Sequence, residues 1–114
     1  MLHVMRVRRC PWVVAFVLTV VTLFSSCAQE VGLPADADPE LRAGADVFRA
    51  RCSSCHGADG GGAIGPSLRE IESRLDDDAQ RVVVVEGRKT MPAFGNSLSD
   101  ADIDAVVRYT SEIL

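Results

Sequence analysis

Two cysteines and a histidine stand close together near the middle of the chain, in the order Cys52-Ser53-Ser54-Cys55-His56. Thiols at this spacing can form a disulfide, act as a redox-active pair, supply half of a zinc site or bond covalently to a porphyrin. The pattern C-x-x-C-H is the attachment sequence of c-type haem. Each thiol can add to one vinyl group, and the adjacent imidazole can then bind the iron. We therefore predict one covalent haem c on Cys52 and Cys55, with His56 as an iron ligand.

The remaining sequence offers little to complete the alternative sites. A thioredoxin-like pair needs a βαβ context, and the residues around the motif do not suggest one. A zinc site would need a second pair of cysteine or histidine ligands, which is absent from residues 57–114. A plain disulfide between Cys52 and Cys55 stays open for a protein in an oxidising compartment.

Few residues could supply a second axial ligand to the iron. His3, Met1 and Met5 lie in an N-terminal segment that we expect to be removed, which leaves His56 and Met91 as the one histidine and the one methionine. Met91 follows His56 by 35 residues and precedes Pro92, so it is expected on a loop. We predict Met91 as the second ligand, with Lys89, Asn96 or an open position as alternatives.

The first 26 residues have the pattern of an export signal. A start with three arginines is followed by an uncharged apolar run of 13 residues, 12–24, whereas a spanning helix needs about 20. Ser25-Ser26-Cys27 comes next and resembles a bacterial lipobox, in which Cys27 would be acylated and become the new N-terminus. Cleavage after Ala28, which would release a soluble periplasmic protein, and an uncleaved membrane helix are the alternatives.

These features divide the chain into a signal peptide (1–26), a flexible tether (27–38) and a domain (39–114). The chain has 114 residues, with 12 basic and 16 acidic side chains and a formal net charge of −4. Loss of a signal with three arginines and no acid lowers that charge to −7. Such an acidic chain is not expected to bind nucleic acid, and it should favour a basic docking patch. A domain this small has too little hydrophobic core to be stable alone, so we expect an additional stabilising element, such as a cofactor.

The domain is predicted to be all-α. Asp38 and Pro39 start a helix predicted over 39–51, and Ser99 starts the last one. Gly44 is expected where these two helices approach closely. Further helices are predicted over 67–75 and 79–86, and the glycine-rich stretch 58–66 is expected to wrap the haem edge.

Taken together, these features resemble the small monohaem bacterial cytochromes c of the His/Met-ligated, class I type. The resemblance covers 39–114 and is carried by the CSSCH motif, Gly65-Pro66-Ser67-Leu68 and Met91-Pro92-Ala93-Phe94. It implies three to five helices wrapped round one haem, with the N- and C-terminal helices crossing.

The resemblance also implies roles for single residues and for the whole chain. The Pro66 carbonyl would accept a hydrogen bond from His56, and Leu68 would pack on the haem. The chain would be a single-electron carrier rather than an enzyme, in a bacterial respiratory or similar chain. It would work as a monomer on the periplasmic side, anchored through a lipid on Cys27, and meet redox partner proteins in membrane complexes.

Two other functions remain open at this point. A haem-based ligand sensor would require that Met91 does not hold the iron tightly. A dedicated cytochrome subunit of an oxidase or dehydrogenase complex would use the same ligands. Arg88 and Lys89, the adjacent basic pair near Met91, could be solvated, contact a partner or face a haem propionate.

Overall fold

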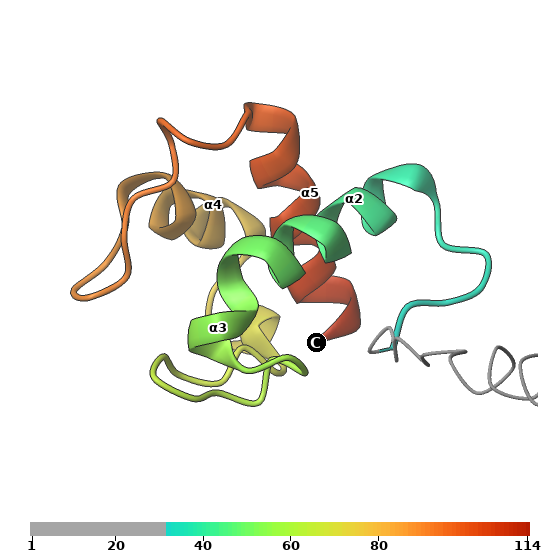
Figure 1. Ribbon diagram of the computed structural model, residues 1–114, viewed down its shortest axis with the longest axis horizontal. Coiled ribbons are helices and arrows are strands. Elements are labelled where there is room, and N and C mark those ends of the chain that lie inside the picture. The colour runs from blue at the N-terminus through green and yellow to red at the C-terminus, as the bar shows by residue number, and fades with distance from the viewer. Residues whose placement is uncertain (1–31) are drawn as a thin grey trace, which may run out of the picture.

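The computed structural model describes residues 32–114 (Figure 1). The predicted signal peptide and Cys27 lie outside this range. The elements, in chain order, are α2 (Pro39–Val47), the π-helical turn η2 (Phe48–Cys52), α3 (Ser53–His56), the 3-10 turn η3 (Ile71–Ser73), α4 (Asp77–Glu86) and α5 (Asp100–Ile113). The described residues form no strand, which confirms the predicted all-α class. None of their helices has the length and apolar character needed to cross a membrane.

The first helix begins as predicted and runs further than predicted. The Asp38 carboxylate accepts the Leu41 N–H at 2.9 Å, and Pro39 occupies the first turn. The helical course then passes through η2, where Ser53 N–H donates to the Phe48 carbonyl, and continues in α3 to His56. A π turn adds a residue, which rotates the following side chains by about 100° relative to a regular helix.

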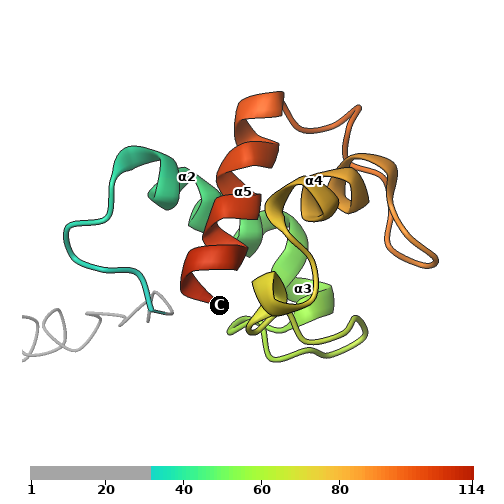
Figure 2. The ribbon, with the colours of Figure 1, turned by 180° about the vertical axis from the view of Figure 1, so that it is seen from behind.

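Helices α2 and α5 cross face to face, as Figures 1 and 2 show from opposite sides. Gly44 makes this possible, because a Cβ there would lie 2.1 Å from the Ala105 carbonyl oxygen. Phe48 and Tyr109 meet beside the crossing, with ring centroids 5.5 Å apart and planes at 46°. The predicted crossing of the first and last helices through Gly44 is confirmed.

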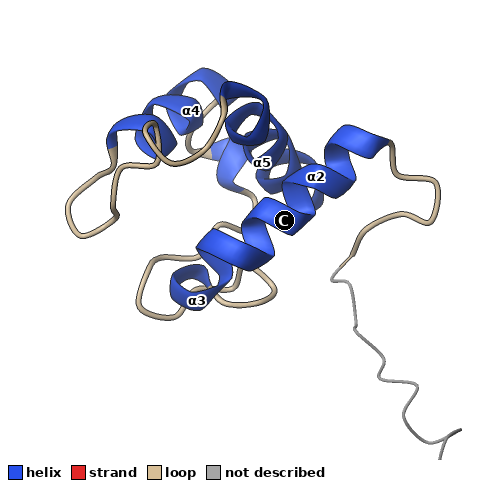
Figure 3. Ribbon diagram, turned by 45° about the horizontal axis from the view of Figure 1, so that its top comes forward, coloured by secondary structure: helices blue, strands red, loops and turns tan. Residues whose placement is uncertain are grey.

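Helix α5 supplies most of the core. Ser99 and Asp102 form a reciprocal capping box at its N-terminus. One face of the helix is buried and consists of Ile103, Ala105, Val106, Val107, Tyr109 and Thr110. Helix α5 packs on both α2 and α4 (Figure 3).

Helix α4 is fastened to α5 by polar side chains. Gln80, which is buried, donates from Nε2 to Ser111 Oγ at 2.9 Å and accepts from Thr110 Oγ1 at 2.9 Å. Arg81 forms ion pairs with Asp100 and Asp104, each at 2.7 Å. The helix predicted over 79–86 is therefore confirmed, because tertiary contacts and the Asp76 cap outweigh the β propensity of its valines.

The prediction of a helix over 67–75 is wrong. Only the single turn η3 forms there. The Leu68 N–H donates to the Gly60 carbonyl at 2.8 Å, and Glu70 takes a left-handed conformation with φ 54°. Glu70 N–H then reaches the Leu114 carbonyl at 3.2 Å. The segment thus closes the glycine-rich loop against the end of the chain instead of continuing as a helix.

The close contact at Gly44 predicts that Gly44→Ala destabilises the fold. Alanine favours a helix by about 1 kcal/mol over glycine, but here its methyl group would enter the Ala105 backbone, and overpacking costs about 1–3 kcal/mol. We expect a lower melting temperature of the haem-loaded protein. Gly61→Ala is the control, since its Cβ would come no closer than 3.0 Å, to the end of the Asp59 side chain. A melting temperature of Gly44→Ala above that of the wild type would contradict the crossing.

The ion pair between Asp38 and Arg108 predicts a loss of stability in acid. The Arg108 guanidinium donates to Asp38 at 2.8 Å and, with the Leu41 N–H, holds the pKa of the Asp38 carboxyl below its ordinary value. A depressed folded-state pKa stabilises the protein above the unfolded-state pKa, and this stability disappears as the pH falls through the folded-state value. Asp38→Asn, which keeps a cap, should therefore be less stable than the wild type at pH 7. Urea unfolding should show the difference shrinking below pH 4; a difference that does not vary with pH would contradict the pairing.

Candidate functional site

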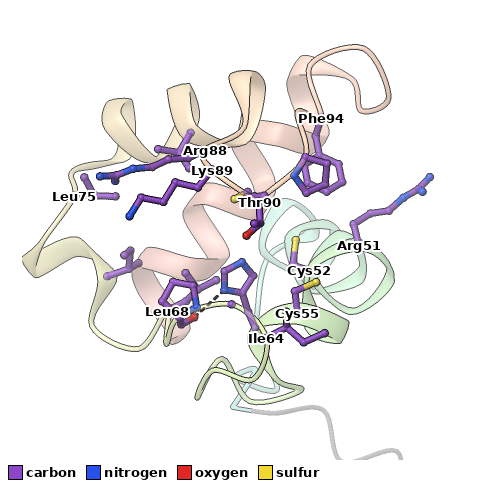
Figure 4. Close-up of a pocket in the computed structure, with 17 residues that line it drawn as sticks. Arg51, Cys52, Cys55, Ile64, Leu68, Leu75, Arg88, Lys89, Thr90 and Phe94 are labelled. Atoms are coloured by element: carbon purple, nitrogen blue, oxygen red, sulfur yellow. Dashed lines mark hydrogen bonds between the residues drawn. The ribbon is translucent and has the colours of Figure 1, made fainter.

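A cavity of about 520 Å³ lies between the α3 segment and the turn that follows α4. This volume is in the range of small-molecule and cofactor sites. The lining consists of Arg51, Cys52, Cys55, His56, Ile64, Gly65, Pro66, Leu68, Ile71, Leu75, Val83, Arg88, Lys89, Thr90, Met91, Pro92 and Phe94. In Figure 4, Cys52 and Cys55 stand on one side of the cavity, and Leu75, Arg88 and Lys89 stand on the other.

The His56 ring is oriented by the loop that follows it. The ring is buried, with 8% of the residue exposed, and Nδ1 lies 2.8 Å from the Pro66 carbonyl oxygen, the contact dashed in Figure 4. A carbonyl can only accept, so Nδ1 carries the proton and Nε2 keeps its lone pair for a metal. Gly65 lets the loop pass over the ring, since a Cβ there would lie 2.9 Å from His56 Cε1.

The two thiols are free and half-buried in the structure. Burial, with a smaller contribution from Cys55, raises the pKa of the Cys52 thiol to about 11. A reactive redox pair has the opposite property, a lowered thiol pKa that supplies thiolate near neutral pH. The environment of Cys52 therefore disfavours the thioredoxin-like alternative.

Met91 is held by a tight turn at the end of α4. The helix ends at Gly87, and Arg88 and Met91 exchange backbone hydrogen bonds of 3.1 and 3.0 Å. After the turn the chain returns along the helix, where Phe94 N–H donates to the Val84 carbonyl at 2.9 Å. Gly87 allows this return, because a Cβ there would lie 2.7 Å from the Met91 carbonyl oxygen. Met91 is thereby placed on a loop, and its side chain borders the cavity.

The residues of the cavity fit a haem. Two thiols stand together on one side, and an imidazole nitrogen and a thioether sulfur are available as iron ligands. The remaining wall is largely apolar and contains no acidic side chain. Such a wall suits a large, flat, apolar group, and a hard cation would find no carboxylate ligand on it.

Every residue that the sequence indicated for the haem site borders this one cavity: Cys52, Cys55, His56, Pro66, Leu68 and Met91. The prediction missed the apolar wall formed by Ile71, Leu75, Val83 and Phe94. Ile71 and Leu75 belong to the segment 67–75, for which the prediction of a helix was wrong. Phe94 lies within the Met91-Pro92-Ala93-Phe94 motif, which was a signal for it. The cavity also includes Arg51, which no motif had marked.

Comparison with known proteins gives consistent matches. Residues 39–109 match the family described as "Cytochrome C oxidase, cbb3-type, subunit III". Cytochrome c6 of Porphyra purpurea is 37% identical over 97 residues, covering 77% of this chain and 84% of that protein. Cytochrome c6 of Picosynechococcus sp. is 36% identical over 94 residues, covering 71% of this chain and 79% of the relative.

A solved structure also resembles the chain. Dihydro-haem d1 dehydrogenase superposes with a TM-score of 0.60 at 37% identity over 63% of this chain. The chain spans only 16% of that longer protein. The shared part is a cytochrome c-type fold, in agreement with the helices and the cavity described above. The chain therefore belongs to the cytochrome c family, as a small monohaem class I member that carries electrons on one covalently bound haem c.

Proposed function

We propose that Cys52 and Cys55 bind the haem through thioether bonds and that His56 and Met91 are its two axial ligands. The observation that carries this proposal is the meeting of all four side chains on one apolar cavity. His56 and Met91 come to it from different elements, α3 and the turn after α4. This arrangement supports ligation of one iron from two sides.

The surrounding residues would tune this site for electron transfer. The bound haem supplies an iron that takes up and returns one electron. Pro66 fixes the orientation of His56, and the return of the chain along α4 fixes Met91, so neither ligand needs to move when the charge changes. The Met91 sulfur and the apolar wall favour the reduced state, because a ferric centre is poorly solvated there. If His56 and Met91 both bind the iron, they would leave no position for a substrate, which supports a carrier rather than an enzyme.

We further propose that the domain 39–114 works outside the cytoplasm of a bacterium, in a respiratory or similar electron-transfer chain. The export signal supports this location, and Cys27 would hold the mature protein, as a monomer, to the membrane by a lipid. Leu33 and Ala37 pack against the helix core, and Arg42 donates to the Ala35 and Ala37 carbonyls, so the second half of the tether 27–38 is held on the domain. The lipid would therefore keep the domain near the membrane surface and its complexes. Cleavage after Ala28 would give the soluble form instead.

A dedicated subunit of a larger complex is the second candidate function. The family description, which names a subunit of an oxidase, favours it. The two functions differ in how the protein associates with the larger complex. A free carrier is recovered alone from detergent extracts, whereas a dedicated subunit copurifies with its complex in a fixed ratio.

Met91→Ala should abolish the sulfur–iron bond. We expect the wild type to be low-spin, with a weak sulfur-to-iron charge-transfer band and no response to CO when reduced. In Met91→Ala the band should vanish, CO should bind, and the reduction potential should fall, since axial ligation sets potentials over about 0.8 V. Asn96→Ala, on the same loop but outside the cavity lining, is the control. A wild-type spectrum that responds to CO would favour the sensor.

Replacing both cysteines should remove the covalent link to haem. In Cys52→Ala/Cys55→Ala protein, acidified organic solvent should extract the haem, while each single variant should retain it through one thioether bond. Denaturing gels stained for haem peroxidase activity read this out directly. Retention of haem by the double variant would show that other residues hold it.

A further inference from the structure

The loop 57–70, which follows His56, has two arms that lie against each other, 57–62 and 65–70. The Leu68 N–H donates to the Gly60 carbonyl at 2.8 Å and joins the arms directly. Gly60 is the one buried residue of this loop, since all the others are exposed or half-buried. The loop lies at the surface, so the atoms that cover Gly60 come from another part of the chain.

Leu114, which follows the last turn of α5, covers Gly60 and contacts both arms of the loop. A Cβ on Gly60 would lie 2.8 Å from Leu114 Cδ1, so the leucine side chain rests on the first arm. On the second arm, the Glu70 N–H donates to the Leu114 carbonyl oxygen at 3.2 Å. Leu114 is half-buried and also packs against the core cluster of α2 and α5. Figures 1 and 2 show the end of α5 beside the loop that follows α3.

An ion pair joins the same two arms on the outside. Arg69 pairs with the Asp59 carboxylate, and its Nε donates to the Asp59 carbonyl at 3.4 Å. Both side chains are more than half exposed, and ion pairs in water contribute little to stability. We therefore expect the apolar contact of Leu114, rather than this ion pair, to hold the arms in place.

We infer that Leu114 is a positioning residue for the axial ligand His56 and acts on it through this loop. The second arm carries the Pro66 carbonyl, whose oxygen lies 2.8 Å from His56 Nδ1. The position of that carbonyl depends on how the second arm is held against the first. Leu114 does not border the cavity, so it would not touch a haem bound there. The inference rests on the proposed function, because it requires His56 to bind the iron.

The chemistry of imidazole ligands gives the direction of the effect. A hydrogen bond from Nδ1–H to a carbonyl raises the basicity of the ring, and a more basic ligand stabilises the ferric state. Without the Leu114 side chain the arms would separate, and the hydrogen bond from His56 to Pro66 would weaken. The reduction potential should therefore rise, and the Nδ1 proton should exchange faster with water.

The test compares Leu114→Ala with Ile113→Ala in the haem-loaded protein. Ile113 is the matched control, because it is also half-buried against the core cluster and lies beside Gly32. In Leu114→Ala, a redox titration should show the equilibrium with a mediator shifted at least threefold toward the reduced protein, or about 28 mV at 59 mV per tenfold. Nuclear magnetic resonance of the reduced protein should show the His56 Nδ1 proton exchanging at least threefold faster. Leu114→Met, which conserves the volume, should resemble the wild type.

Both alanine variants should melt at a lower temperature than the wild type, so the potential and the proton exchange decide the question. An unchanged or lowered potential in Leu114→Ala, an unchanged exchange rate, or the same shifts in Ile113→Ala would overturn the inference. The optical spectrum separates this inference from the proposed ligation. A wild type that is not low-spin counts against ligation by His56 and Met91, whereas a low-spin wild type whose potential is unaffected by Leu114→Ala counts only against the positioning role.

Discussion

Where α2 crosses α5, backbone meets backbone at Gly44, because no side chain keeps the helices apart. α2 continues through η2 into α3, so the crossing also places Cys52, Cys55 and His56. On the other side, α5 fastens α4 through Thr110, and α4 ends in the turn that carries Met91. Both halves of the haem cavity are thus positioned from a single contact.

The cavity makes the cofactor part of the hydrophobic core. Phe48 and Ile103 are the largest side chains that the fold buries completely, and both belong to the helix packing. Leu68, Leu75, Val83 and Phe94 face the cavity and are only half-buried by protein atoms. Fully burying such a side chain is worth about 1.5–3 kcal/mol. Haem in the cavity would therefore supply packing for these side chains that the protein atoms alone do not, and this would couple folding to haem binding.

The helix starts, the close helix contact and the haem attachment site could be predicted from the sequence. Asp38, Ser99 and Gly44 have roles that neighbouring residues reveal, as caps or as a close contact, and CSSCH has a covalent chemistry that its spacing defines. The failures involve contacts between distant residues. The segment 67–75 loses its helix to hydrogen bonds with Gly60 and Leu114, and the π turn η2 has no local marker.

The central claim is that a nitrogen of His56 and the sulfur of Met91 bind the same iron, since low reorganisation and a closed coordination sphere both follow from it. The iron-edge X-ray absorption spectrum of the haem-loaded protein, recorded in both oxidation states, tests it most directly. We predict a single sulfur among nitrogen ligands in each state, with little change in bond lengths between them. A first coordination shell without sulfur in either state would contradict the account.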